Sequence, residues 1–214
     1  MPTRPQASKR VRAESITTRP IVLVLQGPTG VGKDSVVDRL RARTGIHRAT
    51  SSTSRKPRPD ETNGDHYHFL TETEFMERVA AGRFAEWARV FGDLKGLERR
   101  EIEGPLARGE DVIIRTDVQG ARTWRRKLAG ATFVFLGAEH PEALKKRLID
   151  RNTEDAESLA RRLEELDAEM AGMAESDHVV INHHGKIEAA VEEIEAIMAR
   201  ERTNPDRPAP RFVE

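Results

Sequence analysis

The residues with the clearest chemical signature form a run near the start of the chain, Gly27-Pro28-Thr29-Gly30-Val31-Gly32-Lys33. In a G-x-x-x-x-G-K loop the glycines let the backbone curl, so that successive N–H groups face phosphate oxygens at the start of a helix. The side chain of Lys33 then reaches the β- and γ-phosphates of a nucleotide. The spacing therefore predicts a site for the phosphates of ATP. A glycine-rich turn with an incidental lysine is the weaker interpretation.

The position after Lys33 departs from the usual pattern of such loops. Ser or Thr normally offers a hydroxyl to Mg²⁺ there, whereas this chain has Asp34 followed by Ser35. A carboxylate is also a hard oxygen ligand, so Asp34 is a candidate to hold Mg²⁺ directly or through water. The alternative is that Asp34 only favours the first helical turn electrostatically, while phosphates and water hold the metal. The sequence leaves both interpretations open.

A second polar segment, SSTSRKPRP at residues 51–59, is dense in hydroxyls and guanidinium groups. Its prolines restrict the backbone. Arg55 and Arg58 have the planar forks that clamp a phosphomonoester, which predicts an acceptor that carries a phosphate. Taken alone, the segment is also compatible with a solvated basic loop.

Buried strands and helices have to position these residues. Short apolar runs predict strands covered on both faces at 21–25, 112–114, 132–136 and 178–181. Apolar residues at helical spacing predict helices at about 33–43, 118–128, 141–150, 155–174 and 186–201. Strands that alternate with helices favour an α/β fold, with a three-layer core of the P-loop NTPase type around a mostly parallel sheet.

The stretch at about 47–98 does not follow this alternation and predicts an inserted acceptor-binding lobe. Within it, Tyr67-His68-Phe69 is typical of a short strand. Thr71 with Glu74 forms the pattern of a capping box at the start of a helix that ends at Gly82. We expect one domain over 20–201 with a helical lid at about 148–165, and disordered tails at 1–19, which is basic, and at 202–214.

Composition limits the possible partners. The 214 residues carry 36 Lys and Arg against 36 Asp and Glu, so no overall field draws the chain to nucleic acid or to a membrane surface. No apolar run approaches the roughly 20 residues that span a bilayer, and the N-terminal region lacks the apolar stretch of a signal peptide. The absence of cysteine is compatible with a reducing cytosol. We therefore expect a cytoplasmic protein that binds neither nucleic acid nor membrane.

The chain resembles guanylate kinases over roughly residues 20–200. The pieces that carry the resemblance stand in family order: GPTGVGKDS, SSTSRKPRP, NGDHYHF, GRFAEWARVFG, DVQGA, LKKRLIDRN, ARRL and VVIN. The resemblance implies transfer of the γ-phosphoryl group from ATP, as its Mg²⁺ complex, to GMP or dGMP, which gives ADP and GDP or dGDP. Such transfer depends on cations that gather around the γ-phosphate and exclude water.

The resemblance also implies roles for individual side chains. Ser51 and Glu86 are expected to bind the guanine base. The carboxylate of Glu86 can accept the two N–H groups on the Watson–Crick edge of guanine, and adenine does not offer this pair of donors. The other assignments are Arg55, Arg58 and Tyr67 to the acceptor phosphate, Arg147, Arg151 and Arg162 to a lid over the triphosphate, Asn182 to the adenine of ATP, and Asp117 to the metal and acceptor. On spacing alone, Asp117 is equally compatible with a helix N-cap and Asn182 with a turn.

Three positions depart from the family pattern. Lys95 stands where the family has a tyrosine that binds phosphate, and we expect it to keep the anion-binding role. Leu97 replaces a Ser or Thr that helps to hold the base, and it has no hydrogen-bonding group. Arg115 replaces an acid. It lies two residues from Asp117 on an extended strand and is a candidate to pair with Asp34 or Asp117, or to serve a more acidic acceptor.

Two other functions stay open at this stage. The run Lys33-Asp34-Ser35 also resembles ribose 1,5-bisphosphate phosphokinases, whose acceptor is a phosphorylated sugar. A non-catalytic guanylate-kinase-like module that binds protein partners is the third interpretation. Such modules tend to lose the phosphate-loop lysine and the lid arginines, which are all present here. Phosphoryl transfer to GMP is therefore the leading prediction.

Overall fold

A computed structural model describes residues 19–90, 92–140, 142, 169–170 and 172–213. The expected N-terminal tail, apart from residue 19, lies outside this set. So do most of the helices expected at 141–150 and 155–174, and the whole lid expected at about 148–165. Among the described residues, no helix has both the length and the apolar character that crossing a membrane requires.

The core is built around a five-stranded parallel sheet in the order β10-β9-β1-β7-β2. Its strands are β1 (Val22–Gln26), β2 (His47–Arg48), β7 (Val112–Arg115), β9 (Thr132–Ala138) and β10 (His178–Asn182). All residues of the central strand β1 are buried, as expected for an apolar run in a sheet that is covered on both faces. The strands predicted from the sequence are confirmed, and β2 adds a short strand at the edge.

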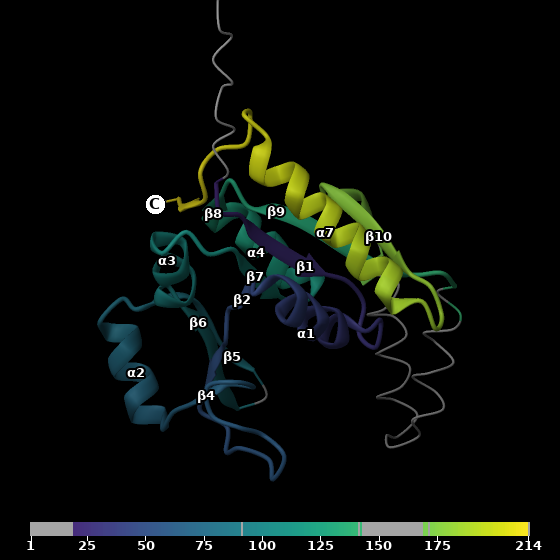
Figure 1. Cartoon of the computed structure of the whole chain (residues 1–214). Coiled ribbons are helices and arrows are strands. Elements are labelled where there is room, and N and C mark those ends of the chain that lie inside the picture. Colours follow the sequence, from purple (N-terminus) through teal and green to yellow (C-terminus); the bar gives the residue numbers. More distant parts are fainter. Residues whose placement is uncertain (1–18, 91, 141, 143–168, 171, 214) are drawn as a thin grey trace, which may run out of the picture.

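Helices cover both faces of this sheet, which makes three layers (Figure 1). Alternate side chains of a strand point to opposite faces. Leu23 and Leu25 pack in one cluster with α1 (Lys33–Thr44) and α7 (Ile187–Thr203). Val22 and Val24 pack in another with α3 (Arg100–Ala107) and α4 (Val118–Lys127). A short 3₁₀ helix, η1 (Gly172–Glu175), precedes β10. The expected α/β core is confirmed.

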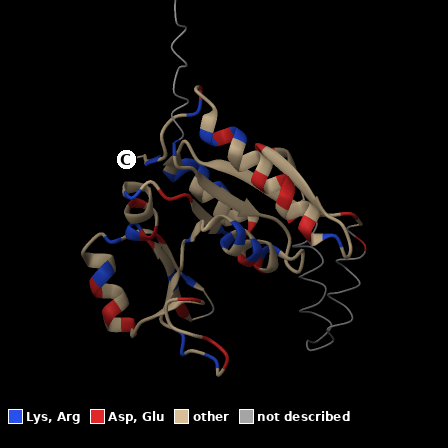
Figure 2. Cartoon of the chain, viewed as in Figure 1, with Lys and Arg blue, Asp and Glu red and all other residues tan. Residues whose placement is uncertain are grey.

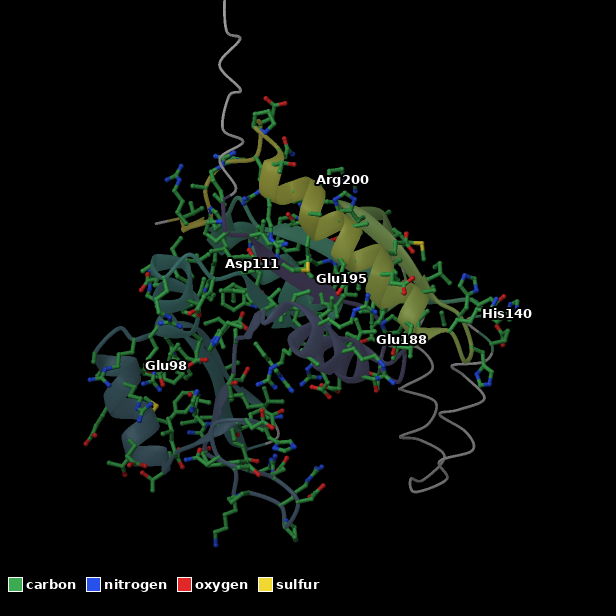
Figure 3. The ribbon with its side chains drawn as sticks, in the orientation of Figure 1. Glu98, Asp111, His140, Glu188, Glu195 and Arg200 are labelled. Atoms are coloured by element: carbon green, nitrogen blue, oxygen red, sulfur yellow. The ribbon has the colours of Figure 1, made fainter. Side chains whose placement is uncertain are left out.

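Ion pairs accompany the contact between α1 and α7. Glu188 and Glu195 of α7, labelled in Figure 3, lie 2.6 Å from Arg39 and 2.7 Å from Arg43 of α1, respectively. Figure 2 shows the basic residues on α1 and the acidic residues along α7. Exposed pairs of this kind contribute only about 0–1 kcal/mol each. The apolar packing of both helices on the sheet therefore matters more for holding the layers together.

The segment between β2 and α3 forms a lobe beside the core (Figure 1). It contains α2 (Glu72–Ala80) and a sheet in the order β4-β3-β6-β5, made of β3 (Ser52–Thr53), β4 (His68–Phe69), β5 (Phe84–Val90) and β6 (Asp93–Glu98). The predicted capping box is present. Thr71 Oγ1 accepts from the Glu74 N–H at 3.2 Å, and the Glu74 carboxylate accepts from the Thr71 N–H at 2.7 Å. Phe75 of α2 stacks on Phe84 at 4.3 Å between ring centroids, which fixes the helix against one face of the lobe sheet.

The C-terminal segment differs from the disordered tail expected at 202–214. Residues Arg211–Phe212 form β11, which pairs antiparallel with β8 (Leu128–Ala129). Arg207 is 6% exposed and donates hydrogen bonds to the carbonyl oxygens of Glu201, Gly130 and Pro20. The expectation rested on the prolines of this segment. It is wrong for the described part, because one buried guanidinium binds carbonyl groups from segments that are distant in sequence.

Substitution Arg207→Ala is expected to lower the free energy of unfolding by about 2–4 kcal/mol. Several carbonyl groups lose a charged donor and stay partly buried. Urea titration followed by circular dichroism measures the change. The matched control is Arg211→Ala, whose exposed side chain is expected to contribute less than about 0.5 kcal/mol. Equal effects of the two substitutions would contradict the account of Arg207.

Candidate active site

The phosphate loop, residues 27–33, connects the end of β1 to the first turn of α1. Its glycines have positive φ angles of 145° at Gly27, 82° at Gly30 and 101° at Gly32, a region that favours glycine. At Gly27 an added Cβ would also lie 2.2 Å from the carbonyl oxygen of Leu136. The shape of the loop therefore depends on glycine, as the sequence pattern predicts.

Asn182 ties the phosphate loop to the neighbouring end of the sheet. It is the last residue of β10, and its side-chain Nδ2 donates to the carbonyl oxygen of Val31 at 2.8 Å. A Cβ on Gly32 would lie 2.9 Å from the same nitrogen. Asn182 thus holds the backbone of the loop. Its assignment to the adenine of ATP stays a prediction.

Lys33 is the first residue of α1, and several charged side chains lie close enough to affect its pKa. Its Nζ donates to the carbonyl oxygens of Gly27 at 2.5 Å and Pro28 at 3.0 Å. Burial lowers the pKa of Lys33. Four charged side chains also act on this pKa. The acids Glu169, Asp117 and Asp34 raise it, and Arg115 lowers it. They converge on the lysine that the motif assigns to the phosphates.

Glu169 is a residue that the sequence pattern did not single out. One of its carboxylate oxygens accepts a hydrogen bond from the N–H of Thr29 at 3.0 Å. It belongs to a charge-rich helical stretch, where a glutamate is typical of a solvated face. The contact means that the phosphate loop presents a backbone amide to an anionic oxygen, which is how such loops bind phosphate.

Asp34, the candidate metal ligand, is paired with two arginines. Its Oδ1 lies 3.0 Å from Nε of Arg115, and its Oδ2 accepts from Nη1 of Arg115 at 3.4 Å. Nη2 of Arg48 lies 3.6 Å from the same Oδ1. The pairing of Arg115 with Asp34, one of the two expected from the sequence, is confirmed. A carboxylate whose two oxygens both face guanidinium groups does not fit a direct Mg²⁺ ligand, because the cations repel one another.

Among the described residues, the side chains around Asp34 form no cluster of metal ligands. Within the ranges that the structure describes, no three His, Cys, Asp or Glu side chains form a group that could hold a metal ion. Mg²⁺ usually keeps several waters and binds substrate phosphates through them or directly. A metal held mainly by the phosphates of a nucleotide, the second of the two interpretations drawn from the sequence, stays a prediction.

Asp117 caps a helix at the same edge of the sheet. It lies between β7 and α4, and its Oδ1 accepts from the N–H of Gly120 at 2.7 Å. The N-cap interpretation is confirmed. The cap also fixes the carboxylate close enough to Lys33 to raise the pKa of that lysine. A role towards metal or acceptor stays a prediction.

The residues assigned to the acceptor phosphate come together around Glu61. Arg55 donates to both carboxylate oxygens of Glu61, at 2.8 and 2.9 Å, and the backbone N–H of Arg58 donates to the same carboxylate at 2.8 Å. The hydrogen bonds from Arg55 lower the pKa of Glu61 to about 2. The guanidinium of Arg55 also lies 5.6 Å from the ring centre of Tyr67, within cation–π range. An acid that the sequence pattern did not single out therefore positions the fork of Arg55.

Strand register places the other acceptor residues on one face of the lobe sheet. Leu97 lies opposite Glu86, and Lys95 is two residues before Leu97 on β6. Alternate residues of a strand share a face, so these three side chains point to the same side. Trp87, the neighbour of Glu86, points to the other side and contacts Phe75 of α2. Lys95, Leu97 and Glu86 therefore occupy the face that α2 leaves free, and Ser51 lies just before β3, the strand next to β6.

Glu86 lies where the lobe meets the core. The pKa of Glu86 is raised to about 7, and burial is the main cause. The charge of Asp117 also raises this pKa, whereas the charge of Lys127 and a hydrogen bond with Trp124 lower it. Lys127 and Trp124 both belong to α4, and Nζ of Lys127 also donates to the carbonyl oxygen of Ala85 at 2.6 Å. A carboxyl group with this pKa is partly protonated at neutral pH. The burial and the neighbours that set the pKa of Glu86 were not predictable from the nearby sequence, because the partners of Glu86 come from α4.

The expected lid arginines, Arg147, Arg151 and Arg162, lie outside the described residues. Their assignment to the triphosphate stays a prediction. The described site consists of the phosphate loop, the carboxylates of Asp34 and Asp117 with their partners, and the free face of the lobe sheet.

Comparison with known proteins identifies relatives over most of the chain. A family model described as guanylate kinase matches residues 17–201. The chain is 41% identical over 186 residues to guanylate kinase 2, chloroplastic/mitochondrial, of Oryza sativa subsp. japonica, a match that covers 86% of this chain and 65% of the rice protein. It is 37% identical over 195 residues to the guanylate kinase of Symbiobacterium thermophilum, covering 91% of this chain and 92% of that protein.

A solved structure has a similar fold. The crystal structure of guanylate kinase from Anaplasma phagocytophilum matches with a TM-score of 0.67 and 23% sequence identity, over 90% of this chain and 92% of that chain. At this identity the likeness concerns the fold alone. It agrees with the mixed α/β architecture and the parallel central sheet described above.

Proposed function

This chain belongs to the guanylate kinase family, and we propose from that membership that it transfers the γ-phosphoryl group of ATP to GMP or dGMP. The products are ADP and the corresponding nucleoside diphosphate. The observation that carries the proposal is the presence, in one chain, of a phosphate loop with Lys33 and of a lobe in which the guanidinium of Arg55 lies beside Tyr67. Ribose 1,5-bisphosphate and a non-catalytic role are not favoured, because the curated relatives carry the names of guanylate kinases.

In the proposed reaction, an oxygen of the acceptor phosphate forms a bond to the γ-phosphorus of ATP. The bond between that phosphorus and the oxygen bridging to the β-phosphate breaks, and ADP leaves with the electron pair. The acceptor phosphate is already ionised, so no general base is needed. The N–H groups of the phosphate loop and the ammonium of Lys33 hold the β- and γ-phosphates in place.

The acceptor phosphate has to be held in line with the γ-phosphate. Arg55 and Arg58 supply guanidinium groups for this purpose, Tyr67 a hydroxyl and Lys95 an ammonium group. Positioning of this kind accounts for much of the rate increase in a reaction that needs little covalent chemistry from the protein. Closure of a lid that carries Arg147, Arg151 and Arg162 would exclude water and neutralise the charge on the transferred group.

Selection of guanine is proposed to depend on Glu86 and Ser51. The ionised carboxylate of Glu86 accepts two N–H groups from the Watson–Crick edge of guanine. Adenine lacks this pair of donors, so it leaves the carboxylate without partners, a cost that favours GMP. Leu97 lies opposite Glu86, but its buried side chain packs in the core cluster with Val22 and Val24, so it adds no hydrogen bond to the base.

Mg²⁺ is proposed to enter the site with ATP. Its ligands are phosphate oxygens and water, because the carboxylate of Asp34 is paired with Arg115. When bound, the metal neutralises charge on the β- and γ-phosphates. A cytoplasmic location also stays a proposal that rests on composition, and the name of the rice relative refers to chloroplasts and mitochondria.

The substrate is tested by an ADP-release assay with ATP, Mg²⁺ and one acceptor at a time. GMP and dGMP are expected to react with a kcat/KM at least about 100-fold above that of AMP, CMP and UMP, because only guanine satisfies Glu86. Ribose 1,5-bisphosphate is included as the competing acceptor. Absent turnover with GMP, or equal turnover with all acceptors, would rule out the proposed substrate.

A further inference from the structure

The junction of the phosphate loop and α1 carries an ionic cluster that the proposed mechanism does not use. Asp34 contacts Arg115 at two points, 3.0 Å from Nε to Oδ1 and 3.4 Å from Nη1 to Oδ2. Arg48 lies 3.6 Å from Asp34 and, through its other terminal nitrogen, 3.6 Å from Asp38. Asp38 follows Asp34 by one turn of α1. Two acids on one helix therefore hold two arginines from other elements.

The two arginines come from β7 and β2, which are neighbouring strands of the central sheet. Arg115 ends β7, at the carboxyl edge of the central sheet, where ligands bind in open α/β sheets. Arg48 ends β2, the last element of the core before the chain enters the lobe. Asp34 thus brings a guanidinium from the sheet edge and one from the lobe entrance to the start of α1.

The geometry leaves Arg115 able to bind an anion. A guanidinium has five N–H donors. Asp34 accepts one hydrogen bond, from Nη1 at 3.4 Å, and its Oδ1 lies 3.0 Å from Nε as an ion-pair contact. The other donors remain for a second acceptor. The side chain of Arg115 is 33% exposed, and Arg115 lies near enough to Lys33 to act on its pKa. An arginine that an ion pair holds in place and that keeps N–H groups for another acceptor is well suited to a phosphate contact.

The charge balance explains why the acid is needed. Lys33, Arg115 and Arg48 would repel one another at the start of α1, whose N-terminus is itself positive. The carboxylate of Asp34 offsets this repulsion and so allows an additional cation beside Lys33. A serine or threonine hydroxyl at position 34 would supply no such charge.

We propose that Arg115 is a catalytic residue that directs its free N–H groups at the phosphoryl group in transfer, and that Asp34 is a positioning residue that holds Arg115 there instead of binding the metal. The inference rests on the proposed function. As the γ-phosphorus passes from the leaving oxygen of ADP to the acceptor oxygen, Arg115 neutralises charge on the equatorial oxygens and gains or loses no proton.

The inference is tested with Arg115→Gln, Asp34→Asn and the double variant, at saturating ATP, GMP and Mg²⁺. Arg115→Gln is expected to lower kcat about 100-fold, as the loss of one preorganised donor does. Asp34→Asn is expected to lower kcat at least about 10-fold, and the double variant no further than Arg115→Gln alone, because the two residues act as a unit. The matched control is Arg108→Gln, which removes a two-point pair with Glu110 away from the site and is expected to leave kcat within about twofold.

A second measurement separates positioning from metal binding. Titration calorimetry of ATP binding at increasing Mg²⁺ is expected to give the same half-maximal Mg²⁺ concentration, within about twofold, for the unaltered protein and for Asp34→Asn. Asp34→Ala, which offers no metal ligand, replaces Asp34→Asn if the latter does not fold, as judged by circular dichroism. A tenfold rise in the Mg²⁺ requirement of the Asp34 variants alone would assign Asp34 to the metal and overturn the proposal.

Two further outcomes would also overturn it. A kcat for Arg115→Gln within threefold of that of the active, unaltered protein would leave Arg115 with no catalytic role. Multiplicative effects in the double variant would show that Asp34 does not act through Arg115. No turnover by the unaltered protein would instead reject the proposed function itself, so the two failures are distinguishable.

Discussion

Replacement of Lys33 by methionine is expected to lower kcat for the ATP- and GMP-dependent reaction by about 1,000-fold. The transferred phosphoryl group would lose the cation that the phosphate loop holds beside it, in a site where fixed charges supply most of the catalysis. Methionine keeps the length and the apolar part of the side chain, so the packing of α1 is preserved. Steady-state kinetics at saturating ATP and GMP measure the effect. The control Lys186→Met, at an exposed lysine before α7, is expected to leave kcat unchanged.

The same substitution is expected to leave the free energy of unfolding unchanged or to raise it slightly. Burial lowers the pKa of Lys33 from 10.5, so the charged form is less favourable in the folded chain than in the unfolded one. This cost is present in full below the lowered pKa and disappears as the pH rises through 10.5. Methionine removes the cost but also removes the hydrogen bonds to Gly27 and Pro28. A large loss of stability would mean that lost activity reflects unfolding.

The phosphate loop was predictable because its information is local. The glycines, Lys33 and the apolar run of β1 lie within a few residues of one another. Glycine is favoured where the backbone has positive φ, and a short apolar run favours a strand that is buried on both faces. The same holds for the capping box of Thr71 and Glu74, where two side chains satisfy two backbone N–H groups three residues apart. Patterns of this kind also predicted the four longer core strands and the helices α1, α4 and α7 to within a few residues, whereas α3 and β2 were not predicted.

The environments of the charged groups were not predictable in the same way. Asp34 meets Arg115 across 81 positions of sequence, and this pairing could only be stated as one of several possibilities for Arg115. The partners of Glu86, Lys127 and Trp124, come from α4, which the lobe approaches through tertiary packing. A charge pattern gives the sign of each group, whereas its pKa depends on burial and on neighbours from other elements.

The C-terminal segment shows a related difficulty. Prolines and polar residues predict disorder because they offer little apolar surface to bury. Arg207 instead binds backbone carbonyls near the end of α7, at the turn before β9 and two residues before β1. The arginine satisfies groups that cannot be recognised as unpaired from the sequence. Polar residues that complete a core are therefore easily mistaken for a tail.

Replacement of Glu86 by glutamine is expected to lower kcat/KM for GMP by about 100-fold or more. The amide of glutamine presents one donor and one acceptor where guanine presents two donors, so one hydrogen bond is lost and two N–H groups face each other. The control Glu77→Gln changes an exposed residue of α2 and is expected to leave kcat/KM unchanged. Similar values for both variants would remove Glu86 from base recognition.

The pH dependence of the KM for GMP is a second test of the role of Glu86. With a pKa of about 7 in the free protein, Glu86 is mostly protonated at pH 6 and mostly ionised at pH 8. The KM for GMP is therefore expected to fall roughly tenfold between these values, because only the carboxylate accepts both N–H groups. The phosphate of GMP also titrates near pH 6, but it does so equally with Glu86→Gln. The ratio of the two KM profiles isolates Glu86, and a ratio that does not change with pH would contradict its raised pKa.

The stability of the free protein is expected to change in the opposite direction to its activity. The pKa of Glu86 is raised from 4.5 to about 7 by burial, so folding takes up a proton between these values and stability falls as the pH rises through them. Above pH 7 the buried charge costs up to about 3 kcal/mol, which glutamine avoids. Urea titrations are expected to show Glu86→Gln more stable than the unaltered chain at pH 8 by about 1–3 kcal/mol, with the gain disappearing near pH 4.5. A carboxylate that weakens the free fold is one that selection for stability alone would replace. The proposed role of Glu86 in binding guanine accounts for its presence.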